Sequence, residues 1–284
     1  MATRTLIDAG ELAGLLGLAR LRLFDCRFDL ARPDDGRRRY LDEHLPGAVY
    51  ADLNRDLSAP VSARSGRHPL PSPAAVEARL QAWGVDGDSL VVACDDGNGM
   101  YAARLWWMLR WLGHDDVAVL DGGMRRWLQL GLPTTDEVPQ PAPGNFIARP
   151  RPELAVDAAA VAVASRDPTL RILDARAPER YRGEVEPIDT VAGHVPGARN
   201  HPFGLSLDGQ GRFLAPEALR DSLTASLEGV PPQRAIAMCG SGVTACHLLL
   251  ALEHAGLPGA RLYPGSWSEW SSDPARPVRT GAAP

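Results

Sequence analysis

The strongest structural signal in the chain lies in residues 235–253, which read Ala-Ile-Ala-Met-Cys-Gly-Ser-Gly-Val-Thr-Ala-Cys-His-Leu-Leu-Leu-Ala-Leu-Glu. A short apolar run leads to a turn of small residues that begins at Cys239, and a helix-like run follows. A thiol at such a turn meets backbone N–H groups and the positive end of a helix dipole. Both favour the thiolate and would hold an anion attached to sulfur, so the pattern predicts nucleophilic sulfur chemistry at Cys239.

Composition narrows the classes of function. The chain has 284 residues, 45% of them hydrophobic, which suits two medium domains with real cores. All 30 basic residues are arginine, so Schiff-base, pyridoxal phosphate and P-loop lysine chemistry are excluded. With a net charge of −5 we expect no nucleic-acid partner. No membrane span or signal peptide is recognisable, so we expect a cytoplasmic protein, and we expect no cofactor.

The four cysteines, Cys26, Cys94, Cys239 and Cys246, show no Cys-x-x-Cys spacing. Zinc and thioredoxin-like sites are therefore not expected, and we predict no metal. A helix would separate Cys239 from Cys246 by about two turns, roughly 10 Å, so reduced thiols are expected.

An internal repeat organises the sequence. An apolar strand that ends in Asp-x-Arg occurs at residues 23–27 and again at 172–176. A later set of residues recurs at a constant offset of 143, as in Gly122 and Gly265, and this offset places Asp96 opposite Cys239. One half therefore carries the thiol and the other does not, which predicts a non-catalytic scaffold in the first half.

Short apolar strands alternate with helical patterns in both halves, for example at residues 73–83, 101–112 and 216–227. This alternation predicts an α/β fold of two tandem domains, each a mainly parallel sheet with helices on both faces. We expect one domain at 1–135, a proline-rich linker at 136–152 and a catalytic domain at 153–284. Ligands should bind at the carboxyl ends of the strands, where Cys239 lies.

These features resemble tandem-domain rhodanese-family sulfurtransferases, especially the 3-mercaptopyruvate type. The resemblance covers nearly the whole chain. The matching motifs are Asp-x-Arg, His-x-Pro-Gly-Ala at residues 44–48 and 194–198, Leu-Asp-Gly-Gly at 120–123, Trp-Trp-Met at 106–108 and Gly-Ser-Trp-Ser-Glu-Trp at 265–270. The resemblance implies two rhodanese-like domains and a Cys239 that alternates between thiolate and persulfide.

The resemblance also implies roles for individual residues. Ser241 and His68 would form a relay with a carboxylate near Asn54, where Asp52 and Asp56 lie on either side. Arg180 would bind the anionic group of the donor. The rest of the cysteine loop would contribute substrate contacts through Gly240, Gly242, Val243 and Thr244.

The donor stays open at this point. The loop Cys-Gly-Ser-Gly-Val-Thr is of the 3-mercaptopyruvate type, because thiosulfate-using relatives carry basic residues after the cysteine. A second arginine of the mercaptopyruvate enzymes has no clear counterpart in residues 184–189, which leaves thiosulfate possible. The implied partners are a small anionic donor and a thiol or cyanide acceptor, and a thioredoxin-like reductant is a further candidate.

The sequence argues against two other functions and leaves a third open. Phosphatases of a related fold use Cys-x5-Arg, and Ala245 stands where the arginine would be. A serine hydrolase would need a Gly-x-Ser-x-Gly elbow that Ser241 lacks. A persulfide carrier that serves a partner protein would use the same loop. For Arg180 the alternative is a salt bridge to Glu179, Glu184 or Glu186, and His44 and His194 are expected to be structural.

Overall fold

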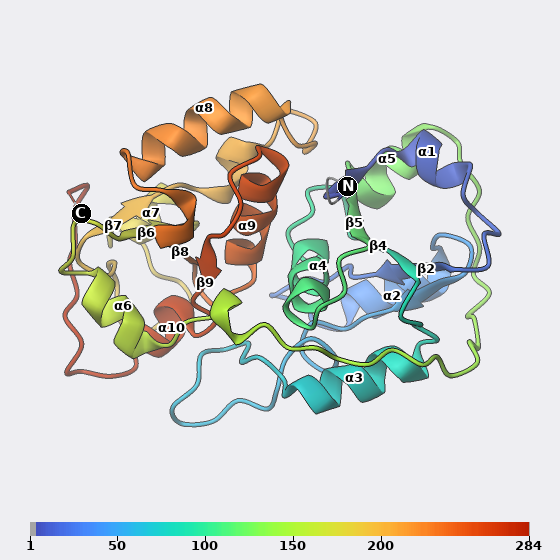
Figure 1. Cartoon of the computed structure of the whole chain (residues 1–284), viewed down its shortest axis with the longest axis horizontal. Helices are drawn as coiled ribbons and strands as arrows, with labels where there is room; N and C mark the ends of the chain where they lie inside the picture. Colours follow the sequence, from blue (N-terminus) through green and yellow to red (C-terminus); the bar gives the residue numbers. More distant parts are fainter. Residues whose placement is uncertain (1–3, 284) are drawn as a thin grey trace. The chain divides into compact units, whose positions relative to one another are not determined.

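The computed structural model describes residues 4–283. The contacts between residues divide the chain into two compact units. Unit 1 contains the residues up to Ala59, Leu70–Arg151 and Gly209–Phe213. Unit 2 contains Pro60–Pro69, Pro152–Asp208 and the described residues from Leu214 onward. Each unit is built on one parallel sheet with helices on both faces (Figure 1), so the predicted α/β fold is confirmed.

The sheet of unit 1 has five parallel strands in the order β1-β5-β4-β2-β3. Their bounds are β1 Leu6–Ile7, β2 Leu21–Asp25, β3 Ala48–Tyr50, β4 Leu90–Cys94 and β5 Val117–Leu120. The helices of this unit are α1 Ala9–Ala13, α2 Asp35–Asp42, α3 Pro73–Ala82, α4 Ala102–Trp111 and α5 Gly123–Gln129.

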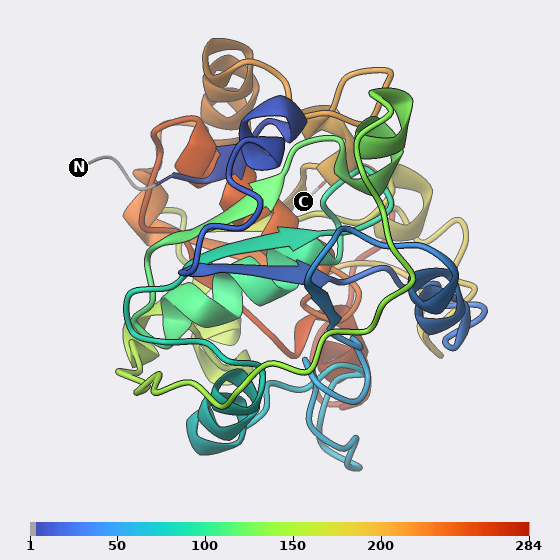
Figure 2. The same ribbon diagram turned by 90° about the vertical axis from the view of Figure 1, so that its right-hand side faces the viewer.

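Side chains alternate between the two faces of this sheet. Alternate residues of β4, Leu90, Val92 and Cys94, pack with α1 and α5 through a core that includes Leu12 and Trp127. The opposite face is covered by α4, whose side chains are almost all buried (Figure 2). Burial on both faces explains why the strands read as continuous apolar runs.

The sheet of unit 2 has four parallel strands in the order β7-β6-β8-β9. Their bounds are β6 Arg171–Asp174, β7 Ala198–Asn200, β8 Ala235–Met238 and β9 Arg261–Leu262. The α-helices are α6 Ala158–Ala164, α7 Pro178–Tyr181, α8 Pro216–Leu227, α9 Thr244–His254 and α10 Ser266–Trp270. Three 3-10 turns complete the unit, namely η1 Pro152–Leu154, η2 Phe203–Ser206 and η3 Pro232–Arg234.

One core of unit 2 joins α6, α7 and α10 to the sheet residues Ile172, Ile236 and Met238. Helices α8 and α9 pack together on the other face (Figure 1). The helical patterns at 73–83, 101–112 and 216–227 correspond to α3, α4 and α8, and proline begins α3 and α8 as expected.

The repeated motifs make the same contacts in both halves. In each Asp-x-Arg motif the arginine pairs with the buried aspartate two residues earlier, at 2.7 Å for both Asp25–Arg27 and Asp174–Arg176. His44 stacks on Tyr40 and His194 on Tyr181, and each histidine Nδ1 also lies within hydrogen-bond distance of the carbonyl of the tyrosine on which it stacks. Both histidines therefore have the structural role that was predicted.

Residues 137–151 form no helix or strand and run along unit 1. The N–H of Phe146 donates to the Val85 carbonyl (3.0 Å), that of Arg149 to Leu112 (2.8 Å) and that of Arg151 to Trp111 (2.8 Å). Phe146 is buried. The proline-rich segment thus packs against the first half along most of its length.

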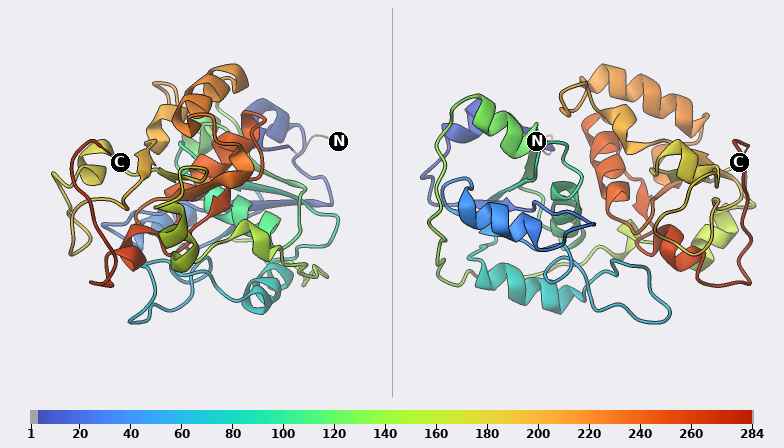
Figure 3. Two further views of the ribbon diagram at one scale, coloured as in Figure 1. Left: turned by 60° about the vertical axis from the view of Figure 1, so that its left-hand side comes forward. Right: turned by 180° about the vertical axis from the view of Figure 1, so that it is seen from behind.

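Two short segments belong to the unit that is formed mostly by the other half of the chain. Residues 60–69 lie between β3 and α3 in sequence and belong to unit 2, where the N–H of Arg67 donates to Ser268 Oγ at 3.1 Å. Residues 209–213 pack with unit 1, where Arg212 and the N–H of Phe213 both bind Asp121 at 2.9 Å. Figure 3 shows the light-blue 60–69 segment leaving the ribbon of its own half. The first segment adds residues to the cysteine site.

None of the helices within residues 4–283 has the length and apolar composition that crossing a bilayer requires.

Candidate active site

Cys239 follows β8 directly and begins the loop that leads into α9. Its backbone N–H donates to Ser266 Oγ (3.0 Å), and its carbonyl accepts from the N–H of Trp267 (2.9 Å). Ser266 has a φ of 53°, a conformation that L-residues rarely adopt, and its bond to Cys239 offsets part of that cost. The start of α10 therefore holds the cysteine loop at the carboxyl edge of the sheet.

The sulfur lies inside the turn of its own loop. The N–H of Gly242 donates to Cys239 Sγ at 3.2 Å, and the Cys239 side chain is only 2% exposed. Gly242 has a φ of 78°, and a Cβ at this position would come within 2.4 Å of the Pro264 carbonyl. Glycine is thus required for the turn that directs this N–H at the sulfur. Val243 occupies the position before α9 without a side-chain capping hydrogen bond, and Thr244 is the first residue of the helix.

Ser241 and His68 lie in hydrogen-bond contact, with Ser241 Oγ 2.7 Å from His68 Nδ1. Both side chains are buried, and 173 residues separate them in sequence. The contact exists because segment 60–69 packs with unit 2. A serine–histidine pair two residues from the thiol can deliver or remove a proton there, and this role stays a prediction.

The carboxylates considered for the relay have other partners in unit 1. Asp52 accepts the N–H groups of Asn54 (2.8 Å) and Arg55 (3.0 Å), which closes a turn. Asp56 accepts the N–H of Asp52 (2.9 Å) and pairs with Arg79 at 2.5 Å. Burial raises the pKa of the Asp56 carboxyl. These contacts give Asp52 and Asp56 structural roles. The carboxylate that would complete the relay stays a prediction.

Arg180 belongs to a buried chain of charges beside the cysteine loop. Its Nη2 binds Glu186 at 2.6 Å and Asp189 at 3.2 Å, and Glu186 also lies 3.5 Å from Arg176. Burial alone would raise the pKa of Glu186, but hydrogen bonds from Arg180 and from the backbone N–H of Asp189 lower it. The salt bridge to Glu186 that was considered for Arg180 is present. It leaves Arg180 next to Gly240, with Nη1 3.5 Å from where a Gly240 Cβ would be.

Arg67 is the residue of this site to which the sequence assigned no role. Its guanidinium pairs with Asp189, which it shares with Arg180. Its Nη2 would lie 2.9 Å from a Cβ on Gly240. The available signal was its position next to His68, since a loop that brings one side chain to a site brings its neighbour close as well.

The first half has a matching loop between β4 and α4, and Asp95 takes the place of the cysteine. The Asp95 carbonyl accepts from Met124 N–H at 2.8 Å, as the Cys239 carbonyl accepts from Trp267. The prediction that Asp96 lies opposite Cys239 is therefore wrong by one residue. The loop of the first half has seven residues (95–101) and the loop of the second half has five (239–243). A constant sequence separation between the halves therefore cannot align the residues within these loops.

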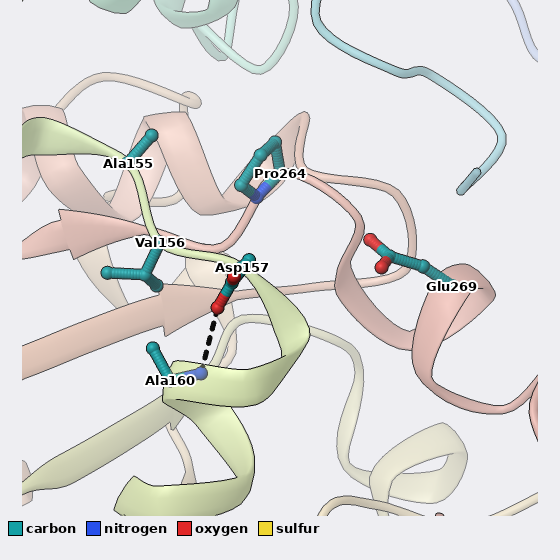
Figure 4. A pocket seen from close by; sticks show the side chains of 6 residues that line it. All are labelled: Ala155, Val156, Asp157, Ala160, Pro264 and Glu269. Carbon is teal, nitrogen blue, oxygen red and sulfur yellow. Dashed lines mark hydrogen bonds between the residues drawn. The ribbon is translucent and has the colours of Figure 1, made fainter. Parts of the chain in front are cut away.

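A separate pocket of about 560 Å³ lies near the start of α6 (Figure 4). Asp157 and Glu269 supply its charge, and Asp157 caps α6 by accepting the N–H of Ala160 at 2.9 Å. Burial raises the pKa of Glu269. Its lining includes none of the predicted site residues, so it is distinct from the cysteine loop.

Comparison with known proteins gives consistent results. The profile of the rhodanese-like domain matches residues 8–130 and 157–273. A Pseudomonas aeruginosa protein named provisionally as a 3-mercaptopyruvate sulfurtransferase is 52% identical over 99% of this chain and 100% of its own. A Mycobacterium tuberculosis protein, SseB, named provisionally as a thiosulfate sulfurtransferase, is 42% identical over 99% and 98%.

Among solved structures, the 3-mercaptopyruvate sulfurtransferase of Leishmania major superposes with a TM-score of 0.84 at 32% identity. The match covers 95% of this chain and 75% of that one.

Proposed function

Because the chain belongs to the rhodanese family of sulfurtransferases, we propose that it moves sulfur from 3-mercaptopyruvate to a thiol or cyanide through a persulfide on Cys239. The observation that carries the donor assignment is the 2.7 Å contact between Ser241 and His68 beside the cysteine. A pyruvate enolate leaving group needs a proton, whereas sulfite does not. The pair is therefore useful with 3-mercaptopyruvate and superfluous with thiosulfate.

In the first step the Cys239 thiolate attacks the thiol sulfur of the donor. A sulfur–sulfur bond forms, the carbon–sulfur bond breaks, and its electron pair leaves on the enolate of pyruvate. Ser241 protonates the enolate and draws its replacement proton from His68. In this step His68 Nδ1 carries the hydrogen and Ser241 Oγ accepts it, as their separation permits.

In the second step the acceptor attacks the outer sulfur of the persulfide. The sulfur–sulfur bond breaks, the acceptor leaves with the outer sulfur, and the Cys239 thiolate is restored. The N–H of Gly242, already 3.2 Å from Sγ, stabilises negative charge on the sulfur in both steps. We propose a small thiol or a thioredoxin-like reductant as the acceptor in the cytoplasm.

A second candidate donor is thiosulfate, which the name of the Mycobacterium tuberculosis relative favours. The test compares kcat/KM for the two donors with one thiol acceptor and locates the added sulfur by mass spectrometry. Preference for 3-mercaptopyruvate with the adduct on Cys239 supports the proposal. A clear preference for thiosulfate would reverse the donor assignment.

A persulfide carrier would behave differently in the same assay. It would give one burst of product per chain and continue only with a protein acceptor. Steady turnover with a small thiol distinguishes the enzyme from the carrier. The Cys94→Ala variant, whose thiol is buried in unit 1, is the matched control for the adduct.

A further inference from the structure

A row of alternating charges leads from the end of β6 to the cysteine loop. It consists of three carboxylates and three arginines, which in order are Asp174, Arg176, Glu186, Arg180, Asp189 and Arg67. Each member pairs with the next, from Asp174–Arg176 at 2.7 Å to Asp189–Arg67. Three positive and three negative charges balance, so this charge row is formally neutral.

The charge row ends beside the nucleophile. A Cβ built on Gly240 would lie 2.9 Å from Arg67 Nη2 and 3.5 Å from Arg180 Nη1. Asp189 binds both of these arginines, one with each carboxylate oxygen, and its side chain is 7% exposed. A nearly buried negative charge is therefore in direct contact with the two cations that are nearest to the residue after Cys239.

The two carboxylates of segment 184–189 that belong to the charge row do different work. Glu186 closes the turn of the segment, because its Oε1 accepts the N–H groups of Ile188 and Asp189, both at 3.1 Å. It also binds Arg180 at 2.6 Å, and this bond does not involve Asp189. The Asp189 side chain instead contributes its charge to the arginines. Its charge can thus be removed while the turn and the Glu186–Arg180 bond are kept.

The balance of charge distinguishes donors by their own charge. With its thiol protonated, 3-mercaptopyruvate carries one negative charge, whereas thiosulfate carries two. A second negative charge that leaves water for a neutral, partly buried site loses hydration without a matching cation. Discrimination between two ligands can come from such an uncompensated charge as well as from favourable contacts.

We propose that Asp189 is a specificity-determining residue, whose carboxylate cancels one positive charge beside Gly240 and thereby favours a singly charged donor over a doubly charged one. This inference rests on the proposed function for the reaction at Cys239. It assigns the choice of donor to a residue outside the cysteine loop. Asp189 acts through the arginines that it contacts.

The test substitutes Asp189→Asn, which removes the charge and keeps one oxygen as an acceptor. The ratio of kcat/KM for thiosulfate to kcat/KM for 3-mercaptopyruvate should rise about 10-fold to 100-fold, because the doubly charged donor gains one more unit-charge interaction at a partly buried site.

Two variants serve as matched controls. Asp189→Glu keeps the charge and should stay within about 3-fold of the parent ratio. Glu184→Gln removes a carboxylate of the same segment, one that is 56% exposed and paired with Arg182 at 2.7 Å. Solvent screens this charge, so the ratio should stay within about 2-fold of the parent value. An equal shift in Asp189→Glu and Asp189→Asn would assign the effect to side-chain shape and overturn the proposal.

A second readout needs no sulfur donor. The rate of Cys239 alkylation is measured with anionic iodoacetate and with neutral iodoacetamide, and the adduct is located by mass spectrometry. The ratio of the two rates should rise several-fold in Asp189→Asn and stay at the parent value in both controls. A general change in the reactivity of the thiol affects both reagents and cancels in the ratio.

The measurements separate the role of Asp189 from the donor assignment. If the parent protein prefers thiosulfate, the donor assignment fails, and a rise of both ratios in Asp189→Asn still supports Asp189. A donor ratio that stays at the parent value in Asp189→Asn overturns the role of Asp189, whichever donor the parent prefers. A donor ratio that rises without the alkylation ratio also overturns it, because the effect is then not one of charge.

Discussion

The loops at 95–101 and 239–243 occupy the same place in their two sheets, and they use their backbone N–H groups in opposite ways. In the first loop the Asp95 carboxylate accepts the N–H groups of Gly97, Gly99, Tyr101 and Ala102, at 2.9–3.2 Å. In the second loop the N–H of Gly242 points at the Cys239 sulfur. One loop is filled by its own carboxylate and the other encloses the sulfur of Cys239.

The first loop keeps the same place after its strand with a carboxylate where the second loop has a thiol. Asp95 is 1% exposed, and burial raises its pKa while the four backbone hydrogen bonds lower it. A carboxylate fixed in this way stabilises the loop by accepting four of its backbone N–H groups.

The largest effect is expected where the nucleophile is removed. Cys239→Ser should lower turnover on the order of 10⁴-fold or more, because a serine hydroxyl is far less nucleophilic than a thiolate and forms no persulfide. Steady-state assays and intact-mass spectra after donor treatment measure both losses. Retained persulfide elsewhere in the chain would show that the second loop is not the reactive one.

The filled loop should matter for stability instead. Asp95→Ala leaves four buried N–H groups without their acceptor and should lower the free energy of unfolding by about 3–5 kcal/mol. Asp95→Asn keeps one acceptor oxygen and should lose less. Urea unfolding followed by tryptophan fluorescence gives the values, with kcat of the folded protein as the control. An unchanged free energy of unfolding in Asp95→Ala would mean that the first loop does not depend on its carboxylate.

Removing the proton pair should have a smaller, donor-dependent effect. Ser241→Ala and His68→Asn should each lower kcat with 3-mercaptopyruvate about 10²-fold, because the enolate loses its proton source. With thiosulfate the same variants should change little. The double variant should be no worse than either single one, since the residues act as a unit. Additive losses would indicate separate roles.

The smallest effect concerns pH and again separates the halves. His201 follows β7, where the first half has Ala51. The backbone N–H of His201 donates to the backbone carbonyl of Asp174, and that of Ala51 to the backbone carbonyl of Asp25, both at 2.9 Å. Burial lowers the pKa of His201 to about 4. As the pH falls, His201 takes up a proton in the unfolded chain before it does so in the folded protein. Its contribution to the free energy of unfolding is therefore present above pH 6.5 and is lost as the pH falls toward 4.

When the pH is lowered from 7 to 5, this histidine should lower the free energy of unfolding of the second half by about 2 kcal/mol. His201→Gln should lose that part of the pH dependence in denaturant unfolding at the two pH values. An unchanged pH dependence in this variant would assign the acid sensitivity to other groups.

Much of the fold followed from local patterns in the chain. The apolar runs, the helix-start prolines and the repeated motifs correspond to the strands and helices of both units. The cysteine loop was recognisable because its strand, turn and helix are adjacent in sequence. The alignment of Asp96 with Cys239 failed because the two loops differ in length, which only the hydrogen bonds between strand, loop and helix reveal.

The sequence by itself determined the two α/β repeats and the position of Cys239, because both depend on the periodicity and order of neighbouring residues. Tertiary structure alone decided the surroundings of the sulfur. The Ser241–His68 contact and the Arg67–Asp189–Arg180 cluster join residues up to 173 positions apart. They form because segment 60–69 packs with unit 2, and no local spacing records such packing.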